Sequence, residues 1–280
     1  MLQKPFHYLF YTMDPIDIMN TVFTILHSFG FRDPQELLEV MKETNTYISG
    51  SVGLLALHPN SFIPNNINFY ASSDFGQHFV NYINYLDFTS LPSISPAYLK
   101  EDIAKILCFR CFTVAHCVNI ILVRTSHPLQ LLPKFHSMLI MNFIAWYGVV
   151  TLYPTLTMNN IGFSNIISSH NWRHFEKYCM RGFEIKHDFL QIQTRKKTHI
   201  CASHPHCPQT VRYLHDGHSL VHHFPQLLEH NKMGFFNERC LAWKLYGGEC
   251  NERSIADKLD GFTLHSAFSI DDNSTSGKLI

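Results

Sequence analysis

Residues 48–70 restrict what this chain can fold into more than any other segment. An apolar run leads into Gly50 and Ser51, a second apolar run follows, and polar Asn66 and Asn68 then alternate with apolar neighbours. Alternation is typical of a strand, because successive strand side chains point to opposite faces of a sheet. The pattern predicts strand, turn, short helix, loop and strand, which indicates an α/β (α+β) fold with a mixed sheet.

Gly50 and Ser51 stand where the first strand runs into the short helix. A glycine there allows the backbone to come close to a ligand, and helix N-terminal amides beside a hydroxyl suit a phosphate group. The following strand presents Asn66 and Asn68 on one face. These four residues are therefore the first candidates for ligand binding.

The same residues carry a resemblance to a known family. A Gly-Ser turn followed by two polar side chains at i and i+2 on a strand resembles the nucleotidyltransferase superfamily, in which carboxylates at these two positions hold two Mg²⁺ ions. The resemblance implies a third acid on a neighbouring strand. Residues 118–123 match that strand, and the alternation of its side chains places Asn119 at the third position.

Further segments resemble uncharacterised fungal proteins that carry the same fold; these are residues 135–142, 153–157, 177–183 and 201–212. The resemblance covers most of residues 14–250. It implies a nucleotidyltransferase-like mixed sheet flanked by helices.

Asparagine at the three metal positions changes what the site can do. An asparagine side chain offers an acceptor oxygen but no negative charge, whereas Mg²⁺ prefers anionic oxygen ligands. At an effective dielectric constant of about 20, one charge pair near 4 Å is worth about 4 kcal/mol. With Asn66, Asn68 and Asn119 in place of acids, we expect no bound magnesium and no transferase activity. The resemblance then implies a nucleotide- or anion-binding module or a protein-interaction module.

Two alternatives stay open at this site. The chain can be a divergent metal-dependent nucleotidyltransferase that uses other acids, or Asn66 and Asn68 can be ordinary polar residues of a solvent-facing strand. Asp74 is close in sequence and could supply one metal ligand. The start of a helix at residues 74–86 explains Asp74 better, because aspartate is a preferred N-cap residue.

A second candidate site lies in the histidine-rich part of the chain. Cys201, His204, His206 and Cys207 form a short cluster of the ligand types that zinc prefers. A further ligand could come from elsewhere in the chain, from Cys179, His215 or Cys250. The alternative is a pair of thiols in a histidine-rich loop without metal. A zinc-stabilised structural or interaction module is therefore the third functional hypothesis.

Composition limits the class of protein. With 280 residues, 46% of them hydrophobic and 16% charged, the chain can bury a large core in one domain with or without an appendage. The net charge of zero argues against nucleic acid as a partner, and Arg195 to Lys197 form the one basic run. We expect an intracellular protein, cytoplasmic or nuclear, with reduced cysteines and no membrane segment, whose partner is a nucleotide or an unidentified protein.

The order of elements follows from periodicity and capping signals. Asp14 and Asp33, each followed by proline, predict two helices, and residues 103–112 with 118–124 predict a β-hairpin. We expect a loop at residues 88–97, one apolar helix at 128–148 with His136 and Asn142 as buried, hydrogen-bonded polar groups, and a strand near 240–246. Residues 153–157 are expected to be extended and residues 170–181 helical.

The distribution of apolar and polar residues along the chain predicts four regions. An N-terminal extension covers residues 1–13, the nucleotidyltransferase-like core covers 14–184, a helical His/Cys-rich region covers 185–262, and a disordered tail covers 263–280.

Overall fold

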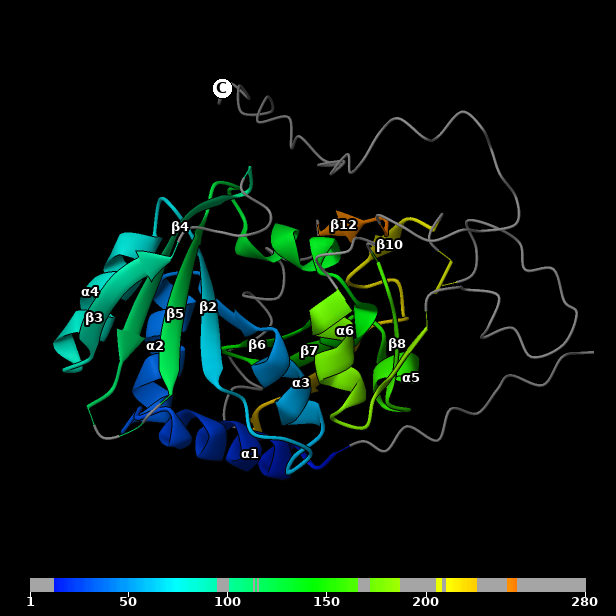
Figure 1. Ribbon diagram of the computed structural model, residues 1–280, viewed down its shortest axis with the longest axis horizontal. Coiled ribbons are helices and arrows are strands. Elements are labelled where there is room, and N and C mark those ends of the chain that lie inside the picture. Colours follow the sequence, from blue (N-terminus) through cyan, green and yellow to red (C-terminus); the bar gives the residue numbers. More distant parts are fainter. Residues whose placement is uncertain are drawn as a thin grey trace, which may run out of the picture.

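A mixed sheet of eight strands forms the centre of the molecule (Figure 1). The computed structural model describes residues 13–94, 101–112, 114, 116–165, 172–186, 205–207, 210–225 and 241–245. The strands of the main sheet lie in the order β11-β7-β6-β1-β2-β5-β4-β3, and β10 pairs with β12 and β8 with β9 in two smaller sheets. In the described part of the main sheet, β2 and β5 run parallel and the other neighbours are antiparallel.

The strands of the main sheet have the following bounds: β1 (Tyr47–Ser49), β2 (Asn66–Ser72), β3 (Thr89–Ile94), β4 (Ile103–Arg110), β5 (Cys117–Val123), β6 (Asn142–Ala145), β7 (Gly148–Thr151) and β11 (Leu220–His223). The smaller sheets contain β8 (Ile161–Phe163), β9 (Glu184–Lys186), β10 (Arg212–Tyr213) and β12 (Ala242–Trp243). The helices are α1 (Pro15–Ser28), α2 (Pro34–Glu43), α3 (Ser51–Leu57), α4 (Gly76–Tyr85), α5 (Pro154–Thr157) and α6 (Trp172–Cys179), with 3-10 helices η1 (Pro128–Lys134) and η2 (Met138–Ile140).

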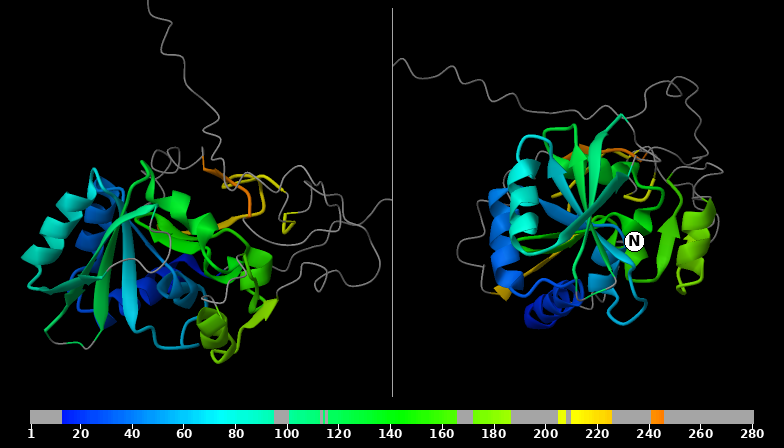
Figure 2. Two further views of the ribbon diagram at one scale, coloured as in Figure 1. Left: turned by 45° about the horizontal axis from the view of Figure 1, so that its top comes forward. Right: turned by 60° about the vertical axis from the view of Figure 1, so that its left-hand side comes forward.

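The two N-terminal helices begin where the capping signals predict. Asp14 accepts a hydrogen bond from the amide of Ile16 at 2.8 Å, and Asp33 accepts one from the amide of Glu36 at 3.0 Å. Each bond satisfies one of the amides that have no partner inside the helix. Figure 2 shows α2 and α4 on one side of the main sheet and α6 with β8 on the other.

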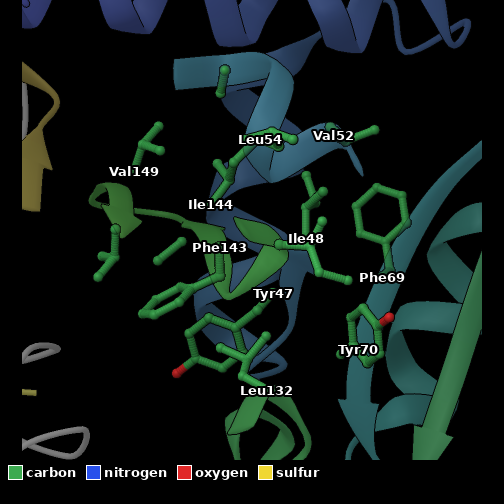
Figure 3. Close-up of a cluster of buried hydrophobic side chains, with 14 of the residues drawn as sticks. Tyr47, Ile48, Val52, Leu54, Phe69, Tyr70, Leu132, Phe143, Ile144 and Val149 are labelled. Carbon is green, nitrogen blue, oxygen red and sulfur yellow. The ribbon is translucent and has the colours of Figure 1, made fainter. Parts of the chain in front are cut away.

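The core lies around β1, all of whose residues are buried. Figure 3 shows Tyr47 and Ile48 of β1 between side chains of α3, β2 and β6. The Tyr47 ring meets Phe143 edge to face at 5.7 Å, and Phe69 of β2 packs on Phe79 of α4 at 4.9 Å. Full burial of one such apolar side chain contributes about 1.5–3 kcal/mol, so this cluster fixes the positions of β1 and β2.

The apolar helix predicted at residues 128–148 is wrong. The segment instead forms η1, η2 and the antiparallel pair β6 and β7. Pro133 lies inside η1, and every residue of β6 and β7 is buried. A strand buried on both faces carries a continuous apolar run, and such a run resembles a buried helix in its periodicity. The turn between the two strands falls at Trp146 and Tyr147.

Three smaller predictions are also wrong. Residues 89–94 of the expected loop form β3, which lies at the edge of the main sheet. Proline has no N–H to donate to a neighbouring strand, and an edge strand tolerates Pro92 because one of its sides has no neighbour in the described part of the sheet. Residues 154–157 are helical rather than extended, with Pro154 in the first turn. Helix α4 begins at Gly76, and its N-cap position is Phe75, so Asp74 does not cap it. The hairpin of β4 and β5 and the helix α6 agree with prediction.

Only residues 185–186, 205–207, 210–225 and 241–245 of the expected helical C-terminal region are described, and none of them lies in an α-helix. Its described residues form β9, β10, β11 and β12, and β11 pairs with β7 at the edge of the main sheet. β12 lies within the strand predicted near residues 240–246. Part of the predicted C-terminal region thus belongs to the same sheet as the core, and the predicted region boundaries stay predictions. The expected N-terminal extension, apart from residue 13, and the expected tail lie outside the described residues.

Candidate functional site

The parallel pairing of β2 with β5 brings three asparagines together. The register places Asn68 opposite Asn119 and Asn66 opposite Cys117, and β1 places Ser49 opposite Asn68 from the other side. Residues in register point to the same face of a sheet. The side chains that the alternation predicts to converge therefore lie side by side in one polar row.

Asn68 is the centre of a hydrogen-bonded cluster that we call the asparagine triad, comprising Asn66, Asn68 and Asn119. Nδ2 of Asn66 donates to Oδ1 of Asn68 at 2.7 Å, and Nδ2 of Asn119 donates to the same oxygen at 2.9 Å. All three residues are partly buried. In this orientation of the amides, Oδ1 of Asn66, Oδ1 of Asn119 and Nδ2 of Asn68 are left for other partners. The triad is neutral and offers both donors and acceptors.

Gly50 lies directly beside the triad. Its φ of +80° is in the region that favours glycine, and a Cβ added there would lie 3.6 Å from Nδ2 of Asn68. Ser51 is the first residue of α3 and is buried. No side chain caps α3, whose N-cap position is Gly50. The hydroxyl of Ser49 is already engaged, because it donates to the carbonyl of Asn142 in β6 at 2.6 Å.

A cation stands at the edge of the same face. Arg110 of β4 is opposite Cys117 of β5, which is opposite Asn66 of β2. The Arg110 side chain is exposed, and its Nη2 lies 3.9 Å from Sγ of Cys117. Cys108 is opposite Asn119 on the same face and is buried. The surroundings of the triad thus add one positive charge and two thiols to its neutral amides.

The described residues do not supply a metal site in place of the acids that the resemblance implies. They contain no group of three or more histidine, cysteine, aspartate or glutamate side chains placed to hold a metal ion. Asp74 follows the far end of β2, which runs from Asn66 to Ser72. Four residues of strand separate Ser72 from Asn68 by about 13 Å, so Asp74 cannot share a metal with the triad.

The proposed zinc ligands are only partly within the described residues. His206 is half-buried, with its ring 6.2 Å from that of Tyr153, and Cys207 is fully buried in the core. Cys201 and His204 lie outside the described residues, as does Cys250. Zinc binding through this set therefore stays a prediction.

Sequence reasoning missed the buried Arg212. Its guanidinium forms an ion pair with Asp216 and donates to the carbonyls of Pro205 at 3.0 Å and Leu152 at 3.1 Å. It also lies over the ring of Tyr153, 4.9 Å from the centroid. Burial raises the pKa of Asp216, but the bonds and charge of Arg212 outweigh this effect and lower it overall. The Arg-x-x-x-Asp spacing was the available signal, although it does not show burial.

The sequence predicts that His136 and Asn142 bond through their side chains to the sheet or to residues 153–157, but the structure shows a different arrangement. Nδ2 of Asn142 donates to the carbonyl of Leu139 at 2.7 Å. His136 accepts a hydrogen bond from the amide of Asn165 through its backbone carbonyl, but Nε2 of its side chain is buried without a partner. The expectation that the His136 side chain is bonded to the sheet is therefore wrong.

Comparison with known proteins adds no assignment. No protein-family model matches the chain, and no curated protein matches it significantly. Among the described residues, no helix combines the length and the apolar character needed to cross a membrane. The functional argument rests on the geometry of the triad.

Proposed function

We propose that the chain is a nucleotidyltransferase-like protein without transferase activity that binds a nucleotide or another phosphate-bearing anion beside Gly50 and the asparagine triad. The observation that carries this proposal is the register of β2 and β5, which aligns Asn68 with Asn119. The three residues at the expected metal positions lie side by side and carry no charge. This favours a site that has lost its metal chemistry over the alternative that β5 is wrongly matched to the third strand of the family.

The chemistry of the site supports binding without a metal. Carboxylates at these positions repel a polyphosphate unless Mg²⁺ screens them, whereas amides donate hydrogen bonds to phosphate or base oxygens. Gly50 allows close approach of the backbone, and Arg110 adds an exposed positive charge on the same face. The site therefore favours an anion that arrives without its metal ion.

Thermal melts with ATP, GTP, CTP and UTP, each with and without Mg²⁺ or Mn²⁺, test the proposal. A ligand at 100 times its Kd adds about 2.7 kcal/mol of stability, so binding should raise the Tm and should do so without metal. Asn66→Ala should reduce the shift, and Asn20→Ala at an exposed position of α1 is the matched control that should leave it unchanged.

Two results would count against the proposal. A Tm that no nucleotide raises removes the binding function. A nucleotidyl product or released pyrophosphate that appears only with Mg²⁺ or Mn²⁺ establishes the divergent enzyme instead.

A further inference from the structure

A group of basic side chains meets where α6 packs against the segment between η1 and η2. We call His136, His174, Lys177 and Arg181 the α6 basic cluster. The ring of His136 stacks on that of His174, with centroids 4.8 Å apart and an interplanar angle of 25°. Lys177 lies one turn along α6 from His174, and Arg181 follows the helix. Residues three and four apart on a helix face the same way, so these groups share one side of α6.

The cluster has no negative counterpart among the described residues. None of the ion pairs found there involves its members, and the nearby Glu184 is 3.4 Å from Lys186 instead. Nε2 of His136 and Nη1 of Arg181 are buried without a hydrogen-bond partner. A buried polar atom left unpaired costs about 1–3 kcal/mol, and native proteins keep few of them. Lys177 acts electrostatically on His136, and Arg181 acts on Lys177, so the two unpartnered atoms belong to neighbouring groups, and a ligand that bonds to both would remove this cost.

The groups are close enough to repel one another. Burial is the main cause that lowers the pKa of His136 to about 3, and the proximity of His174 and Lys177 contributes to the same shift. Burial also lowers the pKa of Lys177, and the charge of Arg181 adds to that effect. Like charges that lie together disfavour each other unless an anion lies between them.

Aromatic side chains hold the arginine in place. The guanidinium carbon of Arg181 lies 4.1 Å above the ring of Phe62 and 5.6 Å from the ring of Tyr178. Stacking of this kind occupies the faces of the guanidinium and leaves its edge for hydrogen bonds. Arg181 is therefore fixed before any ligand arrives, which reduces the entropy that binding costs.

We propose that the α6 basic cluster binds a phosphate group, with Arg181 Nη1 and His136 Nε2 as directed donors and Lys177 as the opposing charge. A tetrahedral oxyanion has several oxygens that donors from different directions can reach at once. The site is separate from the asparagine triad, so the proposal goes beyond the function proposed there. The phosphate can be the free ion or part of a phosphomonoester.

Isothermal titration of the full chain with inorganic phosphate at pH 7 tests the inference. We expect saturable binding that Lys177→Gln weakens at least tenfold, which equals about 1.4 kcal/mol. Lys177→Arg, which keeps the charge, should retain most of the affinity. Arg173→Gln removes one exposed charge from the same helix and should change the Kd less than twofold.

Competition with a nucleoside monophosphate, measured in the Asn66→Ala variant so that the triad does not contribute, identifies the source of the group. If it displaces phosphate and binds at least tenfold more tightly, the ligand is a phosphomonoester; if it binds no more tightly, the ligand is the free ion. Both outcomes support the site. Asn66→Ala, in the triad, should leave the Kd for inorganic phosphate unchanged. Phosphate titration therefore tests the α6 basic cluster, and the nucleotide melts test the triad, so that one proposal can fail without the other.

The inference is overturned if phosphate shows no saturable heat, or if Lys177→Gln and Arg173→Gln weaken binding equally, because diffuse charge then explains it. Loss of phosphate binding in Asn66→Ala also overturns it, since the ion would then lie at the triad. If far-UV circular dichroism shows that Lys177→Gln does not fold, His174→Gln on the exposed side takes its place, with a threefold loss as the criterion.

Discussion

Asn68→Asp and Asn119→Asp are the same chemical change, but we expect them to have different effects on the free energy of unfolding. Oδ1 of Asn68 accepts both hydrogen bonds of the triad. Asn68→Asp keeps that acceptor and makes both bonds charge-assisted. Asn119 donates its Nδ2 to Asn68 at 2.9 Å, so Asn119→Asp places an acceptor oxygen against another acceptor oxygen.

The magnitudes follow from the two bonds. A neutral hydrogen bond contributes about 1 kcal/mol and one to a charged group about 1.5–3 kcal/mol. The gain in Asn68→Asp is offset by removing a carboxylate from water, so its free energy of unfolding should stay within about 1 kcal/mol of wild type. Asn119→Asp loses one bond and adds a repulsion between lone pairs, which should cost about 2–3 kcal/mol.

Urea denaturation at pH 7.5 in the presence of EDTA, followed by circular dichroism, measures both variants. A difference of about 2 kcal/mol also corresponds to about 4–8 °C in Tm for a protein of this size. Asn20→Asp, exposed on α1, adds the same charge away from the triad and should shift the free energy by less than about 0.5 kcal/mol. Equal losses in Asn68→Asp and Asn119→Asp would refute the hydrogen-bond pattern, and a more stable Asn119→Asp would reverse the assignment of donor and acceptor.

Arg212→Ala should lose about 3–5 kcal/mol in urea denaturation, because it removes a fully buried guanidinium and leaves the partly buried carboxylate of Asp216 without its ion pair; a loss below about 1 kcal/mol would contradict the role of the ion pair. Burial lowers the pKa of His127 to about 4 from 6.5, so its contribution is complete above pH 6.5 and is lost as the pH falls towards 4. Between pH 6.5 and pH 4, the His127 side chain makes the free energy of unfolding of the wild type fall by about 1.4 kcal/mol per pH unit. In His127→Gln this part of the pH dependence should be absent, so its free energy of unfolding should fall less steeply over the same range. Gly53→Ala should lower the Tm by several degrees, because the added Cβ would lie 2.8 Å from the backbone oxygen of Asn142.

Local chemistry made part of the fold predictable. Asp14 and Asp33 are each followed by proline, and each aspartate caps its helix through a hydrogen bond to a residue two or three positions further on. A bond over so few residues can be predicted from the local sequence alone. The triad was predictable because alternation fixes the face of Asn66 and Asn68, although its partner strand came from resemblance rather than from the residues. The register that aligns Asn68 with Asn119 is a non-local property of the sheet.

The missed features depend on contacts between distant segments. The run that became β6 and β7 is apolar throughout, because these strands are buried on both faces, so period alone could not exclude a helix. The sequence around Arg212 is typical of an exposed arginine. Its burial depends on Leu152, Tyr153 and Trp243, which are distant in the sequence and enclose the guanidinium in the fold. The unpartnered Nε2 of His136 likewise appears only once α6 is placed against it.

Manganese binding by the wild-type chain and by the triple variant Asn66→Asp, Asn68→Asp, Asn119→Asp tests the central claim most directly. The proposed function takes the triad to occupy the positions of three metal-binding acids, so the triple variant should bind Mn²⁺ with a Kd below about 1 mM, equivalent to about 4 kcal/mol, and Mn²⁺ should raise its Tm. The wild type should show neither effect. Tight Mn²⁺ binding by the wild type, or no gain in affinity in the triple variant, would contradict the account of a neutral site on a metal-binding scaffold.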